Sequence, residues 1–386
     1  MISRAGARSV GLALGLLAPL APLAPAACSP AGAQGSGVAS TSAPSSPAAP
    51  AIEASSKSAP PIVVSQAADA GSDASAPANA EAKGAEAEAK AGAPPVISAA
   101  EAEAALFLTS ETQRAPEVMA CRAEASEQDR IRCSLKLLFK ADALAANEAV
   151  NLHALSGHVV GVEVEQWMDG GYRGKLHLVP EPPVLAHRKH LEWVAQASAD
   201  FEAFFKGIAA TAARPIRYRH RALLLRYFRS VGARTPSAFA YDWTISYNVS
   251  GSLHRTADAV RETMFHEIFH LNDRARGDWS EAALGAIYAG IAARCGTRIP
   301  CLTPYAPSET TIRGGTYYAF HPQNGVVEYA AELGLRYYRE QRAMLLKRPL
   351  AKAPFKCGPP ENARAWDLLK DEFFGGVDLV PPCRLR

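Results

Sequence analysis

Aromatic side chains are missing from the first quarter of this chain. Residues 1–97 contain no Phe, Tyr or Trp and are dominated by Ala, Ser, Pro and Gly. Such a stretch cannot bury enough apolar surface to offset the entropy that is lost when it is ordered. We therefore predict that residues 29–97 form a disordered linker. Residues 98–386 hold every aromatic side chain and are long enough for one large folded domain.

The chain also lacks an excess of charge of one sign and a long uninterrupted apolar run. Its formal net charge is +3 in 386 residues, so charge gives no reason to expect nucleic acid as a partner. The longest apolar run, Val10 to Leu23, is interrupted by Pro19 and Pro22. It is too short and too broken to cross a bilayer as a helix of the mature protein.

The N-terminus has the features of an export signal. Arg4 and Arg8 precede the apolar run, and the segment Pro25-Ala26-Ala27-Cys28 follows it. Small residues before a cysteine are similar to the signal of bacterial lipoproteins, so residues 1–28 are predicted to be a signal peptide that ends at a lipidated Cys28. Pro25 departs from the aliphatic residue usual in that signal, and cleavage by the ordinary signal peptidase is the alternative.

Both interpretations place the protein outside the cytoplasm. With a lipidated Cys28 we expect a bacterial outer-membrane lipoprotein, held to the membrane by its lipid and facing the periplasm or the cell surface. With ordinary cleavage we expect a secreted protein.

Cysteine is scarce, and C-x-x-C spacing is absent from the sequence. That absence weighs against a metal cluster held by cysteines. An even number of further cysteines in an exported chain favours disulfides, with nearest-neighbour pairing as the simplest arrangement. The residues predicted to form disulfides are Cys121, Cys133, Cys295, Cys301, Cys357 and Cys383.

Apolar periodicity predicts the main elements of the folded part. Helical spacing runs from Ile131 to about Val150 and again after Pro182-Pro183 to Phe205, whereas alternation predicts half-buried strands at 160–164, 175–179 and 243–249. Asp169-Gly170-Gly171 predicts a hairpin turn between the first two strands. The third strand is expected to be an edge to which an extended peptide could add. Three histidines are expected at the surface: His187, His190 and His254.

The strongest chemical signal is His266-Glu267-Ile268-Phe269-His270, the H-E-x-x-H pattern. Thr256 is the predicted N-cap of a helix that runs to about Asn272. Spacing of i, i+4 directs both imidazoles at one point, which suits tetrahedral zinc. Glu267 lies beside the first histidine, so it can act as the general base on a zinc-bound water without being a ligand.

Apolar residues on two faces of this helix indicate that it is sandwiched inside the protein. Val260, Met264 and Ile268 form one stripe, and Phe265 and Phe269 form a second. Two imidazoles and a carboxylate between these faces need partners, which one divalent cation supplies. The alternative, a pair of histidines on an ordinary surface helix, is disfavoured by the two apolar stripes.

A catalytic zinc ion needs a third protein ligand and an open position. The x-x-G-x-x-H continuation of metzincins is missing, since Arg276 stands where their third histidine would be. The better candidates are Glu328 and Glu332, one turn apart on a mostly apolar helix that is predicted to begin after Asn324. The alternative for both is a solvated helix face with Arg336 as an ion-pair partner of Glu332.

The second helix also has a composition suited to close packing. The small residues Ala331 and Gly334 would let it approach the H-E-x-x-H helix closely. Should neither Glu328 nor Glu332 bind the metal, Asp273 and Asp278 are the next candidates for the third ligand.

H-E-x-x-H followed on a later helix by E-x-x-x-D/E resembles the gluzincin metallopeptidases. The form Glu328-Tyr329-Ala330-Ala331-Glu332 is similar to the E-F-F-A-E motif of the lethal-factor-like toxin peptidases, and the resemblance covers about residues 240–340. It implies an α+β, zincin-like fold with the active-site helix beside a small mixed sheet. It also implies that Glu328 ligates zinc and that Glu332 holds a ligating histidine.

In the toxin family a tyrosine one to two turns before the glutamate assists catalysis. At the corresponding spacing this chain has His321, and Tyr317 and Tyr318 lie close to it in sequence. All three residues compete for the role of stabilising the oxyanion.

The sequence thus predicts an exported zinc metalloendopeptidase that acts on peptides or proteins. One alternative is a non-catalytic exported or lipid-anchored zinc-binding protein with a structural or relict site. The intact Glu267 argues against it, because a structural site does not need a base. Another alternative is a metal-dependent hydrolase of a non-peptide bond, and the strand next to the zinc helix favours peptides over it.

Overall fold

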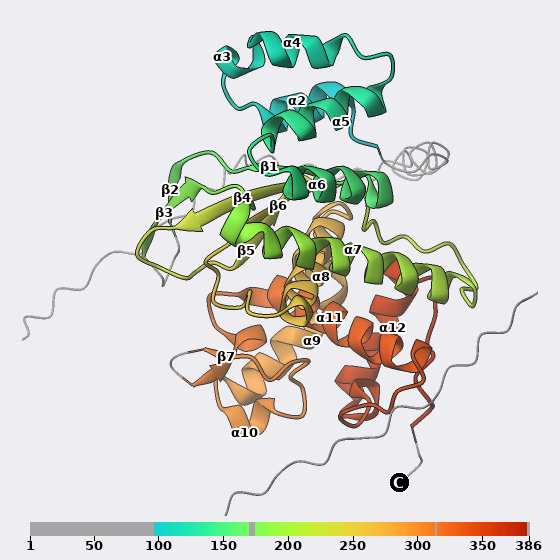
Figure 1. The fold of residues 1–386 in the computed structure, drawn as a ribbon. Helices are drawn as coiled ribbons and strands as arrows, with labels where there is room; N and C mark the ends of the chain where they lie inside the picture. Colours follow the sequence, from blue (N-terminus) through green and yellow to red (C-terminus); the bar gives the residue numbers. More distant parts are fainter. Residues whose placement is uncertain (1–95, 170–173, 313–314, 384–386) are drawn as a thin grey trace, which may run out of the picture. The chain divides into compact units, whose positions relative to one another are not determined.

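The computed structural model describes residues 96–169, 174–312 and 315–383. The predicted signal peptide with Cys28, and the predicted linker up to residue 95, lie outside the described residues. The described part has an α+β fold, in which helices surround a curled mixed sheet (Figure 1). None of its helices is both long and apolar enough to cross a membrane.

The sheet is organised around β4, which pairs along both of its edges. On one edge, its first half is parallel to β1 and its second half is antiparallel to β3, which in turn pairs with β2. On the other edge lies the parallel strand β6, and β5 pairs antiparallel to β6 and ends the sheet. The strands are β1 (Val159–Val162), β2 (Gln166–Asp169), β3 (Lys175–Pro180), β4 (Leu224–Ser230), β5 (Ala238–Tyr241) and β6 (Thr244–Asn248).

Helices make up most of the described chain. A small hairpin of β7 (Thr311–Ile312) and β8 (Thr316–Tyr317) lies between α10 and α11 in the sequence. The N-terminal helices are α2 (Ala99–Leu106), α3 (Ser110–Gln113), α4 (Pro116–Arg122), α5 (Glu127–Leu138) and α6 (Ala143–Ser156). The others are α7 (Arg188–Ala209), α8 (Ala257–Arg274), α9 (Trp279–Cys295), α10 (Ile299–Leu302), α11 (Gly325–Leu345) and α12 (Pro360–Phe373).

The predicted single helix from Ile131 to Val150 is two helices. It is interrupted between α5 and α6 because Asp142 caps a new helix: its Oδ1 accepts hydrogen bonds from the backbone N–H groups of Leu144 and Ala145, both at 3.1 Å. The cap satisfies donors that would otherwise be unpaired at a helix start.

The prediction of one half-buried strand at 160–164 is also wrong. β1 ends at Val162, and its residues from Val159 to Gly161 are all buried. A Cβ atom on Gly161 would lie 2.8 Å from the carbonyl oxygen of Ala105, so α2 covers β1 directly. Both faces of β1 are therefore enclosed. The predicted turn begins at Asp169, the last residue of β2, and Gly170 and Gly171 lie outside the described residues.

β6 was predicted to be a half-buried edge strand, and it is neither. It lies between β4 and β5, and each of its five residues is buried. Its polar side chains are satisfied by neighbours instead of water: the Ser246 hydroxyl donates to the Glu163 carboxylate, and the Asn248 amide donates to the Pro236 carbonyl at 2.8 Å. Alternating polarity here indicates buried hydrogen bonds. The true edge is β5.

Two of the three histidines expected at the surface are buried against β6. His190 is 2% exposed and lies 2.9 Å from the Tyr247 hydroxyl through Nδ1. His254 is 5% exposed and stacks on the Tyr247 ring, with 3.9 Å between the ring centroids. His187, which precedes α7, is partly exposed. This packing could not be predicted from local patterns, because the contacts join α7, β6 and the segment before α8.

The H-E-x-x-H helix lies inside the molecule, as its two apolar stripes predicted. α8 packs against α7, α11 and the β5 end of the sheet. Val260, Phe265, Ile268 and Phe269 are completely buried. A Cβ atom on Gly334 would lie 2.5 Å from a Phe269 ring carbon, so a glycine is what allows α11 to approach α8 this closely.

Cysteines form three disulfides within the described part. Cys121 pairs with Cys133, Cys295 with Cys301, and Cys357 with Cys383, and the Cα atoms of each pair are 5.3–5.4 Å apart. These are the nearest-neighbour pairs predicted from the sequence. The first two close short loops, with sequence separations of 12 and 6, whereas the third closes a loop that contains α12.

Candidate metal centre

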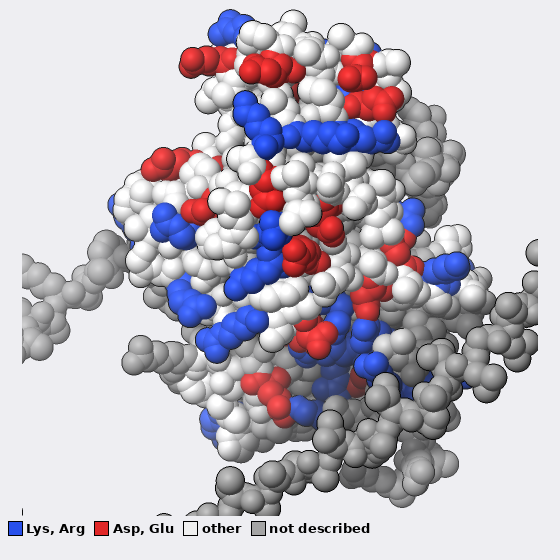
Figure 2. Space-filling model, viewed as in Figure 1, with Lys and Arg blue, Asp and Glu red and all other residues white. Residues whose placement is uncertain are grey.

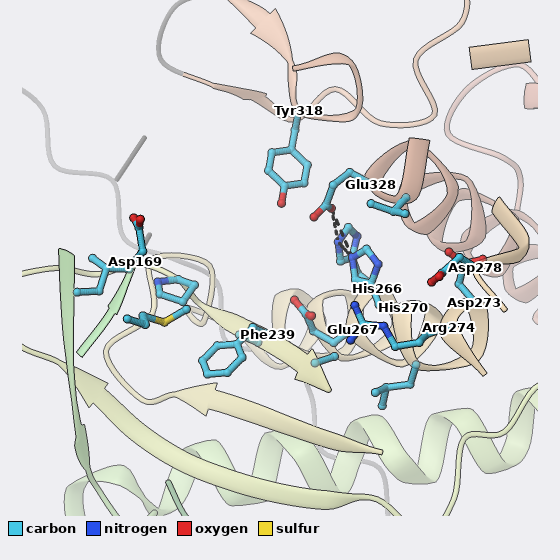
Figure 3. A pocket seen from close by; sticks show the side chains of 17 residues that line it. Asp169, Phe239, His266, Glu267, His270, Asp273, Arg274, Asp278, Tyr318 and Glu328 are labelled. Carbon is cyan, nitrogen blue, oxygen red and sulfur yellow. Dashed lines mark hydrogen bonds and ion pairs between the residues drawn. The ribbon is translucent and has the colours of Figure 1, made fainter. Parts of the chain in front are cut away.

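Two ring nitrogens and one carboxylate oxygen converge between α8 and α11 (Figure 3). Nε2 of His266 lies 3.0 Å from Oε2 of Glu328 and 3.1 Å from Nε2 of His270. Nε2 of His270 lies 3.5 Å from the same Glu328 oxygen. The i, i+4 spacing on α8 brings the two imidazoles together, and the packing of α11 on α8 adds the carboxylate.

The three separations fit a tetrahedral metal ion. Donor atoms about 2.0–2.1 Å from a tetrahedral zinc ion are about 3.3–3.4 Å from one another, and the observed edges are 3.0, 3.1 and 3.5 Å. Two ring nitrogens and one carboxylate oxygen meet at one point, and a bound cation can accept a lone pair from all three at once. Nitrogen and oxygen donors suit zinc, and the geometry does not by itself identify the metal.

Glu332 lies behind the histidine pair. Its Oε1 is 3.4 Å from Nδ1 of His266, on the opposite side of the ring from the convergence point. A proton on Nδ1 shared with Glu332 leaves the Nε2 lone pair of His266 directed at the convergence point. Glu328 and Glu332 therefore occupy different positions: Glu328 lies among the converging donors, and Glu332 lies at the far ring nitrogen of His266.

Burial and pairing act in opposite directions on these carboxylates. Burial disfavours ionisation of Glu328 and Glu332, but hydrogen bonds to the histidines outweigh it and lower the pKa of both carboxyl groups. Burial also disfavours protonation of His266, whereas Glu328 and Glu332 favour it more strongly and raise its pKa. The ionised forms of Glu328 and Glu332 and the protonated form of His266 thus stabilise one another at a site that water reaches poorly.

Glu267 belongs to the same site and is absent from the group of converging donors. It is 8% exposed, and burial raises the pKa of its carboxyl group above the ordinary value, although the neighbouring His266 and His270 oppose the shift. A raised pKa brings a carboxylate closer to the range in which it exchanges protons near neutral pH. Its carboxylate projects into the cavity in front of the histidines (Figure 3).

Of the three candidates for the oxyanion role, Tyr318 alone lies at the site. Its ring centroid is 6.2 Å from that of His266, and its hydroxyl points into the cavity from the side opposite Glu267 (Figure 3). Tyr317 is buried, and its hydroxyl lies 3.0 Å from the Thr303 hydroxyl. His321 lies after the short 3-10 helix of residues 318–320 and does not line the cavities around the metal centre. The change from strand to 3-10 helix after Tyr317 points the neighbouring side chains in different directions, which the sequence spacing did not resolve.

The C-terminal end of α8 is fixed by hydrogen bonds that the sequence did not reveal. The Asn272 side chain accepts from the Arg219 backbone N–H at 2.7 Å and donates to the Arg219 carbonyl at 2.8 Å. The Asp273 carboxylate accepts from the backbone N–H and hydroxyl of Ser280, at 2.7 and 2.6 Å. Asp273 therefore caps α9. Neither it nor Asp278 joins the converging donors.

Two cavities meet at the metal centre and follow α8 in opposite directions. One, of about 380 Å³, extends from the histidines past β5 towards Asp169 and Arg274. The other, of about 340 Å³, extends past Glu262 and Leu335. Five residues line both cavities: Pro236, Ala238, His266, Glu267 and Tyr318.

No protein-family model matches this sequence, and no curated protein or solved structure is significantly similar to it. The case for a metal centre therefore rests on the donors and their geometry.

On the face shown in Figure 2, acidic and basic side chains are interspersed over the surface.

Proposed function

We propose that this protein is a zinc metallopeptidase with a zincin-like fold that hydrolyses peptide bonds. The observation that carries the proposal is the convergence of His266, His270 and Glu328 beside a buried Glu267 that is not one of the donors. A structural zinc site has four protein ligands and is closed, whereas a catalytic site has three and an open position. Three donors facing a cavity support the catalytic alternative.

Each residue of the site then has a defined task. A bound zinc ion would polarise the carbonyl of the scissile peptide and make a water molecule more acidic. Glu267 removes the proton from the attacking water and delivers it to the leaving amine. The Tyr318 hydroxyl donates a hydrogen bond to the oxygen on which negative charge develops. Glu332 holds His266 in the orientation that keeps Nε2 directed at the metal.

The edge of the sheet supports a peptide as the substrate. Within the described residues β5 pairs on one side with β6 and has no strand on its other side. Ala238 and Phe239 of β5 line the cavity at the metal centre. An extended peptide can pair with such an edge through main-chain hydrogen bonds and pass both cavities with its scissile bond at the metal. This edge replaces β6, which the sequence had suggested.

Export is also part of the proposal. Disulfides persist in oxidising compartments, and the three disulfides of the described part support a protein that acts outside the cytoplasm. A lipid at Cys28 would hold the enzyme at a bacterial outer membrane, with secretion as the alternative. Cys28 itself lies outside the described residues.

Metal analysis and one substitution test the function. The purified protein should contain about one zinc ion per chain and should cleave peptides from a mixed library until a chelator removes the metal. Glu267→Gln should retain zinc and fold but lose most of the cleavage, because an amide cannot accept the proton. A protein that neither contains zinc nor takes it up would exclude this function. Full cleavage by Glu267→Gln would assign the base to another residue.

A further inference from the structure

A third cavity adjoins the second one, and basic side chains outnumber acidic ones in its lining. It has a volume of about 640 Å³ and shares Thr310 and Arg339 with the second cavity at the metal. A substrate bound at the metal can therefore extend into it. Its charged lining consists of the basic residues Arg336, Arg339, Arg342, Arg348 and Lys352 and the acidic residues Glu309 and Glu340.

Three of the arginines lie along α11, and carboxylates hold each of them from one side. Arg339 forms two hydrogen bonds with Glu262, at 2.8 and 2.6 Å, and Arg342 is held by Asp200 in the same manner. Arg336 is held by Glu340 and by a backbone carbonyl. Within the described part of the chain, all of these hydrogen bonds use Nε or Nη2. Nη1 of each arginine is therefore left to donate to a ligand, and the guanidinium groups are already oriented.

Arg348 and Lys352 add positive charge that neighbouring carboxylates neutralise only in part. The Arg348 side chain is exposed, and its guanidinium group forms no hydrogen bond or ion pair with a residue that the structure describes, whereas its backbone N–H donates to the Ala343 carbonyl at 2.8 Å. Lys352 pairs with Glu309, but both side chains are exposed, at 46% and 76%, so this ion pair is weak. The cavity therefore offers an excess of cationic donors to a ligand.

We propose that this basic cavity binds acidic side chains of the peptide that is cleaved at the metal centre. The inference rests on the proposed function. Arg339 and Arg342 follow Glu328, the donor at the metal centre, by eleven and fourteen residues on α11, or about 16 and 21 Å at about 1.5 Å per residue. An extended peptide advances about 3.3 Å per residue, so the acidic side chains lie about five to six residues from the scissile bond, on one side of it.

Binding to an inactive protein tests the inference without requiring turnover. The zinc-loaded Glu267→Gln protein is titrated with two fluorescent peptide pools that are identical except that every Glu of the first is Gln in the second. The Glu pool should bind about fivefold more tightly, and the difference should shrink as salt is raised. Adding Arg348→Glu should remove the difference. Adding Lys140→Glu, an equal charge change on the exposed turn after α5, should not.

The parent protein provides a separate readout with the same pools. Glu should be enriched about five to six residues from the cut bonds, on one side only. Equal binding of the two pools would overturn the inference, and cleavage without enrichment of Glu would leave the proposed function standing alone. A binding preference without any cleavage would support the acidic ligand and refute the peptidase.

Anionic membranes are the competing occupant of a basic surface. Vesicles that contain phosphatidylglycerol should bind the Glu267→Gln protein no better than they bind the double variant that carries both Glu267→Gln and Arg348→Glu. Vesicle binding that depends on Arg348, together with equal binding of the two peptide pools, would assign the cavity to a membrane surface and overturn the inference.

Discussion

Removal of Glu328 and removal of Glu332 should have effects on zinc affinity that differ in size. Glu328 supplies an oxygen 3.0 and 3.5 Å from the two histidine nitrogens, whereas Glu332 contacts His266 at 3.4 Å from its far side. A four-ligand zinc site contributes about 10–16 kcal/mol of binding, or about 3 kcal/mol per ligand. Glu328→Ala should therefore weaken zinc binding by about 100-fold to 1,000-fold and abolish cleavage.

Glu332→Ala should weaken zinc binding by about 10-fold to 100-fold, the usual effect of losing a partner that orients a ligand. Both variants are titrated with zinc in competition with a chromophoric chelator. Glu281→Ala, which removes an exposed carboxylate from α9, is the control and should bind like the parent. A larger loss in Glu332→Ala than in Glu328→Ala would exchange the two roles. Parental affinity in both would refute the metal centre as described.

Three further predictions concern the fold. Gly334→Ala should lower the free energy of unfolding, measured by urea titration, by about 1–3 kcal/mol, because the added Cβ would overlap the Phe269 ring. The control is Gly290→Ala on α9, where an added Cβ meets no other atom. It should be neutral or stabilising in the same titration. Burial lowers the pKa of His158 and His190 to about 3. Below the ordinary histidine pKa of 6.5 the unfolded chain binds more protons than the folded protein, so each histidine should cost about 2 kcal/mol of stability between pH 7 and pH 5. His190→Asn should reduce that pH dependence, and an unchanged dependence would contradict the sign. Thiol labelling of the denatured, non-reduced protein after export should find the six predicted disulfide cysteines unreactive; two or more labelled cysteines would contradict their pairing.

Local patterns were sufficient wherever short-range geometry decides the structure. The i, i+4 spacing of His266 and His270 places two imidazoles on one helix side in any fold that keeps the helix. The apolar residues around them predicted a sandwiched helix, and the lack of a Cβ atom at Gly334 predicted close packing of α11 on α8. These inferences depend on helical periodicity, which can be read along the chain.

Long-range pairing decided the rest. β6 has the alternating pattern of a half-exposed strand, but Glu163 is the partner of its Ser246, and Ser230 and Pro236 are the partners of its Asn248. Only the fold brings these residues together. β5 is the edge that borders the metal centre, and four residues are too short a pattern to predict a strand. Likewise, Tyr317 and Tyr318 are equivalent in sequence. Tyr317 ends β8 and its hydroxyl lies beside that of Thr303, whereas Tyr318 begins a 3-10 helix and lines the cavity, because the backbone changes conformation between the two residues.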